Sequence, residues 1–188
     1  MRHGIPMADG KPDRSSGVSG TCQAIPSFFL HDPFNRHTAM FSKACEYALR
    51  ATIYIAQKGE ETRLGIPDIA EATDAPPPFI AKILQSLSKE GVVSSAKGPN
   101  GGFFITAKQK KLPVRSVLHA LGEDMELEKC VLGLNQCSEK KPCPLHKEYK
   151  VIKINLIRLF ETKTIQDLAA DINNGTSFIN NKATRIAR

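Results

Sequence analysis

The chain has 188 residues and a formal net charge of +7, with 26 Lys and Arg against 19 Asp and Glu. Its 41% of hydrophobic residues is enough for a packed core and excludes wholesale disorder. No stretch approaches the roughly 18 uninterrupted apolar residues of a membrane helix, and five cysteines without an export signal argue against a secreted disulfide scaffold. We therefore predict a cytoplasmic protein of one domain with appendages, whose basic charge suits nucleic acid.

Residues 1–39 differ in composition from the rest of the chain. They contain several glycines and prolines and show neither a helical nor a strand period. We expect a flexible extension that adds nothing to the function. Met40 opens a strongly patterned segment, and we interpret it as the natural start of the protein.

Three helices are predicted between residues 42 and 90. From Ser42, a plausible N-cap, apolar residues recur at helical spacing as far as Ala56, and Gly59 follows as a terminator. A second, short helix is predicted over 67–73. The proline-rich turn 74–78 then precedes a third helix that ends at Gly91. Its apolar face consists of Phe79, Ile80, Ile83, Leu84 and Leu87.

A β-hairpin is predicted next. The β-prone runs 92–95 and 103–106 flank the segment 97–102, whose three glycines favour a tight turn. Helix, helix, turn, helix and hairpin is the order of a winged helix-turn-helix. We therefore predict a DNA-binding domain over 40–111, with the helix-turn-helix at about 66–89 and the wing at about 92–106.

The expected DNA contacts follow from this order. The N-terminal part of the recognition helix would face base edges, but its prolines carry no hydrogen-bond donor, so we expect sparse direct reading and a contribution from DNA shape. A lysine on the wing could enter the minor groove or neutralise a phosphate, and the start of the first helix favours a phosphate. The candidate residues are Ser42, Lys43, Pro77, Pro78, Lys82, Gln85, Lys97, Gly98 and Asn100.

The C-terminal half is predicted to contain a connecting helix within 112–127, a cysteine loop over 128–146, and a long helix with its following segment over 145–172. A polar tail follows over 173–188. The long helix has a broad apolar surface, which either pairs with a second chain or covers the protein's own core. The predicted fold is thus mainly α with a small β-hairpin.

The cysteine loop carries the clearest chemical signal. Cys130, Cys137 and Cys143 have the spacing C-x6-C-x5-C, and thiolates are soft ligands that suit iron–sulfur clusters, zinc and copper. The spacing is unlike the C-x2-C pairs of most zinc ribbons, which lowers the case for zinc without removing it. His146 is the local candidate for a fourth ligand, and Glu46 of the same or a partner subunit is the alternative. Cys45 on the apolar helix face is expected to be a core residue, and Cys22 a bystander.

The segment from Met40 to about Ile172 resembles the Rrf2 family of winged-helix transcription regulators. The matching stretches are 41–50, 69–71, 79–84 and the wing 95–103, together with the three cysteines and the run 143–146. The resemblance implies a homodimer that binds palindromic promoter DNA and holds a cluster at the cysteines. His146 matches the ligand position of the cluster regulators, whereas Glu46 matches the acidic position that nitric-oxide-sensing members take from the other subunit. The family often has Arg where this chain has Lys97, which keeps the charge but loses the planar fork.

We predict, accordingly, a transcription regulator rather than an enzyme. It would act as a repressor whose promoter binding depends on an iron–sulfur cluster that senses redox, nitric oxide or cluster status. A 2Fe–2S cluster is favoured, 4Fe–4S is possible, and zinc is the alternative. We expect no membrane and no small-molecule substrate. The alternative function is a structural-zinc winged helix that binds another protein.

Overall fold

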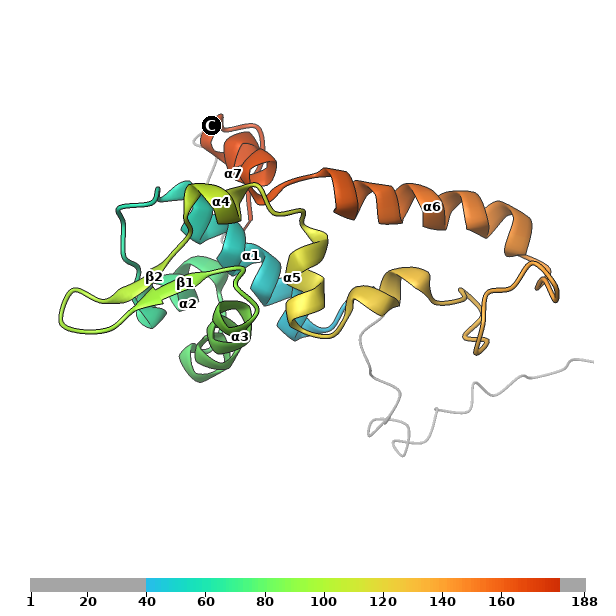
Figure 1. Cartoon of the computed structure of the whole chain (residues 1–188), viewed down its shortest axis with the longest axis horizontal. Helices are drawn as coiled ribbons and strands as arrows, with labels where there is room; N and C mark the ends of the chain where they lie inside the picture. The colour runs from blue at the N-terminus through green and yellow to red at the C-terminus, as the bar shows by residue number, and fades with distance from the viewer. Residues whose placement is uncertain (1–39, 180–188) are drawn as a thin grey trace, which may run out of the picture. The chain divides into compact units, whose positions relative to one another are not determined.

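The computed structural model describes residues 40–179. The extension predicted over 1–39, including Cys22, and the end of the predicted tail, 180–188, lie outside the described residues. The fold is mainly helical with one antiparallel hairpin, as predicted (Figure 1). Within residues 40–179, no helix is long and apolar enough to cross a membrane.

The elements follow one another in the expected order of a winged helix-turn-helix. They are α1 (Lys43–Gln57), α2 (Ile66–Thr73), α3 (Pro77–Lys89), β1 (Ser94–Ala96), β2 (Gly102–Phe104), α4 (Ala107–Lys110), α5 (Arg115–Ala120), the 3₁₀ helix η2 (Asp124–Glu128), α6 (His146–Thr162) and α7 (Ile165–Asn173).

Local sequence signals explain the boundaries of the first three helices. Ser42 is the N-cap of α1, because its Oγ accepts a hydrogen bond from the N–H of Cys45 at 3.2 Å. Asp74 ends α2 in the left-handed region, with φ of 55°, and its N–H bonds the last carbonyls of that helix. Pro76 is the N-cap of α3, and prolines at the first helical positions are tolerated because those N–H groups lack a helical partner.

A principal hydrophobic core joins α1, α2, α3, the hairpin and α7. Helix α1 packs against α2, α3, α5 and α7, and its small residues allow the close approach of its neighbours. The largest fully buried side chains of this core are Ile55, Ile69, Ile80, Leu84, Leu87, Val92, Val93, Ile105, Val117 and Ile165.

The hairpin is shorter than predicted and has an additional neighbour. Its register pairs Ser94 with Phe104 and Ala96 with Gly102, whereas Val92 and Val93 are buried in the core before the strand begins. Leu64, between α1 and α2, exchanges two backbone hydrogen bonds with Phe103, at 3.0 and 2.9 Å. This bridge fixes the wing against the helical core, and no pattern in the sequence had indicated it.

The connection after the wing differs from the single helix expected. The short helix α4 was not predicted, although Thr106 and Gln109 form a capping box at its start. Helix α5 has 6 residues and is followed by Gly122 with φ of +71°, a conformation that ends a helix. The chain then continues as η2, so two short elements replace one connecting helix.

The long C-terminal segment is divided into two helices. Thr164 accepts a hydrogen bond from the N–H of Asp167 at 3.1 Å, and the Asp167 carboxylate accepts one from the N–H of Thr164 at 2.9 Å. This capping box starts α7, so that α6 ends at Thr162. Pro113 and Thr164 form an isolated bridge at the same point, which ties the division to the start of α5.

A second, smaller core lies where α1, α5, η2 and α6 meet. Cys45, Leu118 and Leu127 are its fully buried members, which confirms the expected core position of Cys45. Phe41, Leu49, Leu121, Leu156, Ile157 and Phe160 pack around them.

Candidate functional site

The exposed face of α3 carries the predicted DNA-reading residues. Pro77, Pro78, Lys82 and Gln85 are all exposed, while Ile80, Ile83 and Leu84 on the opposite face are buried in the principal core. Phe79 was predicted to face inward, but 38% of its surface is exposed, and its ring meets Tyr47 edge-on at 5.9 Å. Helix α3 therefore presents an apolar, proline-rich start followed by two polar side chains, which suits contact with thymine methyl groups and shape readout.

The wing presents its polar tip to solvent. Lys97, Gly98 and Asn100 are exposed, and Gly98 has φ of +106°. A Cβ atom on Gly101 would lie 2.4 Å from the carbonyl oxygen of Ala96, so only glycine fits this turn. The hairpin can therefore be narrow enough to bring a cation close to a DNA groove.

Two serines join the wing to the recognition helix. The hydroxyls of Ser88 in α3 and Ser95 in β1 lie 3.3 Å apart. The bond fixes the distance between the two predicted DNA-contacting elements. Sequence reasoning missed it, because neither serine belongs to a pattern that points to the other.

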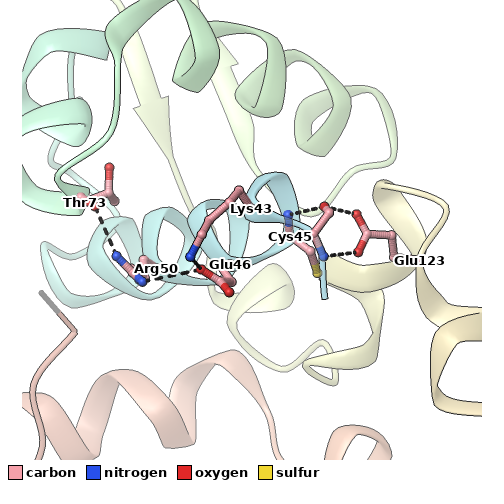
Figure 2. A network of polar contacts seen from close by, with 7 residues as sticks. Lys43, Cys45, Glu46, Arg50, Thr73 and Glu123 are labelled. Atoms are coloured by element: carbon pink, nitrogen blue, oxygen red, sulfur yellow. Dashed lines mark hydrogen bonds and ion pairs between the residues drawn. The ribbon is translucent and has the colours of Figure 1, made fainter. Parts of the chain in front are cut away.

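The start of α1 is occupied by groups of the protein itself. The Glu123 carboxylate accepts hydrogen bonds from the N–H of Ser42, at 3.0 Å, and from its hydroxyl (Figure 2). Lys43 pairs with Glu46 at 2.6 Å. Ser42 and Lys43, both predicted to meet a phosphate, therefore already have anionic partners in this structure.

The cysteine loop lies between η2 and the start of α6, which run beside each other (Figure 1). Cys130 is buried, and Cys137 and Cys143 are half-buried. The pKa of Cys130 is lowered, first by hydrogen bonds from backbone N–H groups, chiefly that of Leu132, and then by a hydrogen bond with the Cys143 side chain and by Lys153. Cys130 and Cys143 are thus brought together in an environment that favours a thiolate.

His146 makes a second contact within the cysteine loop, in addition to that between Cys130 and Cys143. Its Nδ1 lies 3.5 Å from Sγ of Cys137, and only 7% of the residue is exposed. Its Nε2 lies 3.3 Å from Oε1 of Glu139 but is buried without a hydrogen bond. A histidine at the first position of an exposed helix would ordinarily be solvated, so this burial beside a thiol distinguishes it from a simple helix-start residue.

Glu46 occupies a different position. Its carboxylate on α1 pairs with Lys43 and lies 3.8 Å from Arg50, whose guanidinium also reaches the carbonyl oxygen of Thr73 at 3.5 Å (Figure 2). Within one subunit, the Glu46 carboxylate therefore pairs with α1 side chains rather than with the cysteine loop.

The predicted ligands form two pairs rather than one closed set. Among residues 40–179, no group of three or more His, Cys, Asp and Glu side chains is placed to hold a metal ion. The donor chemistry nevertheless fits a soft metal centre, because three thiols and one buried imidazole lie in the same loop, with Nδ1 of His146 beside the Cys137 thiol.

A cavity of about 780 Å³ adjoins these residues between η2, the loop and α6. Cys130 and Cys137 line it on the loop side and Lys153 contributes positive charge, whereas Arg115 is paired there with Glu128 and Glu161. An anionic, thiolate-bound group would find both ligands and charge compensation there.

A family model for Rrf2, described as an iron-dependent transcriptional regulator, matches residues 41–171. The chain belongs to the Rrf2 family. A putative HTH-type transcriptional regulator of Aquifex aeolicus is 34% identical over 131 residues, covering 69% of this chain and 90% of that protein. The HTH-type transcriptional regulator NsrR of Geobacillus kaustophilus is 27% identical, covering 67% and 86%. The solved structure of T. potens IscR has the same fold, with a TM-score of 0.56 at 18% identity, over 73% of this chain and 90% of that one.

The Rrf2 membership establishes a DNA-binding transcriptional regulator rather than an enzyme. DNA is therefore the expected ligand of the winged helix, and α3 and the wing form the candidate nucleic-acid interface of this Rrf2 protein.

Proposed function

We propose that this Rrf2 regulator is a cytoplasmic, homodimeric repressor whose affinity for palindromic promoter DNA is set by an iron–sulfur cluster. The observation that carries the proposal is the meeting of Cys137 with buried His146, in the same loop as the Cys130–Cys143 pair. Soft donors gathered at this density in a reduced protein are suited to an iron–sulfur cluster. Two relatives with the names NsrR and IscR support the choice of sensor.

His146 is the proposed fourth ligand beside Cys130, Cys137 and Cys143. The 3.5 Å approach of its Nδ1 to Cys137 supports this choice, and the engagement of Glu46 with Lys43 and Arg50 weighs against the alternative. Glu46 of a partner subunit stays the competing ligand. Ligation by three thiolates and one imidazole favours a 2Fe–2S over a 4Fe–4S cluster in this proposal, with zinc as the alternative metal.

A bound cluster would supply a redox-sensitive centre that holds the loop together. The protein's own residues do the rest. Cys130 lies two residues after the end of η2, and Cys143 lies three residues before the start of α6, so a closed loop fixes the end of one element against the start of the other. An open loop releases them, and the population of DNA-competent dimers changes accordingly.

Helix α6 is the proposed dimerisation surface. His146 is the only buried residue of this helix in the described chain, and four of its large apolar side chains are more than half exposed: Val151, Ile152, Ile154 and Leu159. Apolar side chains gathered on one helix gain stability when a second copy covers them. A two-fold dimer would also place two recognition helices on a palindrome, as symmetric operators require.

The DNA contacts of this proposal are the exposed start of α3 and the wing tip, with Lys82, Gln85, Lys97 and Asn100 as the polar contacts. Pro77, Pro78 and Gly98 shape the surface around them. Ser42 and Lys43 stay candidates for phosphate contact, provided that their present carboxylate partners are displaced.

Anaerobic purification followed by iron, sulfide and visible-absorption measurements tests the proposal. We expect a coloured protein with equal amounts of iron and acid-labile sulfide, lost when Cys130, Cys137 and Cys143 are replaced by Ser. A colourless protein with one zinc ion per chain would overturn it and favour the structural-zinc reading. Binding to promoter DNA that is absent, or indifferent to salt, would favour a protein partner instead.

A further inference from the structure

The contact between Ser42 and Glu123 joins residues 81 positions apart in the sequence. It forms a short chain of hydrogen bonds: the N–H of Cys45 donates to Oγ of Ser42, and the Ser42 hydroxyl donates in turn to Glu123. The second carboxylate oxygen accepts the Ser42 N–H at 3.0 Å (Figure 2). Two bonds to one carboxylate fix orientation as well as distance.

Glu123 sits at the junction between the DNA-binding half and the cysteine loop. Gly122, in the left-handed conformation, ends the α5 segment, and η2 begins at Asp124. The backbone of Glu123 is itself anchored, since its N–H bonds the carbonyl of Leu118 at 2.9 Å and its carbonyl accepts the N–H of Glu126 at 3.1 Å. The carboxylate therefore cannot leave Ser42 through a simple backbone swing while η2 keeps its place.

The small core next to this contact includes residues of η2 and α6, the two elements that flank the cysteine loop. Leu127, buried with Cys45, lies three residues before Cys130, and Phe160 of α6 meets Phe41 edge-on at 5.5 Å. Helix α6 starts at His146, three residues after Cys143. A change in loop closure therefore acts on η2 and α6, and both elements pack against the start of α1.

Helix α1 also reaches the recognition helix. Tyr47 contacts Phe79 in the first turns of α3, and Arg50 bonds the Thr73 carbonyl just before the turn of the helix-turn-helix. These contacts connect α1 to the segment that carries the predicted DNA-contacting residues. The described contacts form one continuous route from the loop, through Glu123, to α3.

We propose that Glu123 is the positioning residue that couples cluster binding to DNA binding, by holding the first turn of α1 on η2. The inference rests on the proposed function, because it concerns how the cluster acts on the winged helix. Glu123 binds neither cluster nor DNA in this account. Its removal should leave both ligands bound and break the thermodynamic link between them.

The test compares DNA affinity with and without the cluster in wild type and in Glu123→Ala. The probe is a duplex that wild-type holoprotein selects from a random-sequence library. Iron content and melting temperature are measured on every sample. For wild type we expect at least a roughly fivefold difference between the two forms, the lower end of usual coupling. For Glu123→Ala we expect a ratio within about twofold of one, with iron content preserved.

Glu126→Ala is the matched control. Glu126 belongs to the same 3₁₀ helix and pairs only with nearby Lys129 in the described structure, so this variant should keep the wild-type ratio. Ser42→Ala removes the hydroxyl bond to Glu123 from the α1 side, away from the cysteine loop, and leaves the backbone N–H bond in place. It should lower the ratio in the same direction as Glu123→Ala, and the double variant should lower it no further than Glu123→Ala alone.

Thermodynamic linkage provides a second measurement, cluster retention in the presence of DNA, which would not change if Glu123 had only a structural role. If the cluster changes DNA affinity, DNA must change cluster retention by the same factor. We expect the probe duplex to alter cluster retention against an iron chelator in wild type and in Glu126→Ala, but not in Glu123→Ala.

The possible results distinguish failure of the proposed function from failure of the coupling through Glu123. A wild-type protein without iron, or with equal DNA affinity in both forms, overturns the proposed function and the coupling with it. If the DNA affinity of the wild type depends on the cluster, and that of Glu123→Ala and Ser42→Ala depends on it to the same extent, the coupling proposal alone is overturned. Should Glu123→Ala fail to fold, Ser42→Ala decides by the same ratio.

Discussion

Sγ of Cys137 lies 3.5 Å from Nδ1 of His146, and that imidazole is buried at the first residue of α6. The contact links the middle of the cysteine loop to the helix that follows it. The choice between His146 and Glu46 as the fourth ligand can therefore be tested with single substitutions.

We predict that His146→Ala loses most of the cluster absorption, whereas Glu46→Ala retains it. The reason is geometric, because the imidazole already adjoins a ligand thiol and the Glu46 carboxylate is held by Lys43. Visible absorption and iron content per chain check this under anaerobic conditions. The reverse result, with loss only in Glu46→Ala, would assign the fourth ligand to the partner subunit.

Lys97→Ala should weaken binding to all DNA sequences by a similar factor. A wing cation that neutralises one phosphate contributes about 0.9 to the slope of log K against log salt, and the slope should fall by about that amount. Lys108→Ala is the control, since it removes the same charge from α4, outside the proposed interface. A salt slope that Lys97→Ala leaves at the wild-type value would exclude a phosphate contact by the wing tip.

Ile152→Glu should dissociate the proposed dimer. Ile152 on α6 is 62% exposed in the single chain, and covering a charge there would cost enough to weaken association by about tenfold or more. Sedimentation over a range of concentrations measures this. Gln166→Glu introduces the same charge on α7 and should leave association unchanged; equal behaviour of the two variants would remove α6 from the interface.

Asp167→Asn should lower the melting temperature at neutral pH but not in acid. The pKa of Asp167 is lowered, first by the backbone N–H of Thr164 and then by the Thr164 hydroxyl. Because the folded-state pKa lies below the unfolded value, the carboxylate stabilises α7 above the ordinary pKa, and this stabilisation disappears as pH falls through the folded value.

Thermal unfolding from pH 7 down to pH 3 measures the difference between wild type and Asp167→Asn. Asp171→Asn, on the same helix, is the matched control. A difference for Asp167→Asn that stays constant over the whole range would show that the charge has no part in the capping box.

Much of the helical architecture could be predicted because it follows from local rules. Helical spacing located α1, and the glycines of 98–102 indicated the hairpin; the prolines marked the start of α3, although the turn predicted over 74–78 ends at Pro76 and Pro77 is already helical. The division between α6 and α7 also had a local signal, the capping pair Thr164 and Asp167, which sequence reasoning overlooked.

Other features depend on residues distant in the chain and could not be read from any pattern. Leu64 pairs with Phe103 across two segments distant in the sequence, and Phe79 is partly exposed and meets Tyr47 of α1 instead of entering the principal core. Of the candidate site, the cysteines and His146 were identifiable by their chemistry and spacing. Glu123 was not, because an acidic residue after a short helix resembles any solvated charge until Ser42 is placed beside it.

The most direct test of the central claim is the affinity of the dimer for promoter DNA before and after removal of the cluster, measured anaerobically on one preparation across a salt series. We predict that the two forms differ by at least about fivefold at every salt concentration, and that restoring the cluster restores the original affinity. Equal affinities in the two forms, on a protein shown to have carried iron and sulfide, would contradict control of DNA binding by the cluster.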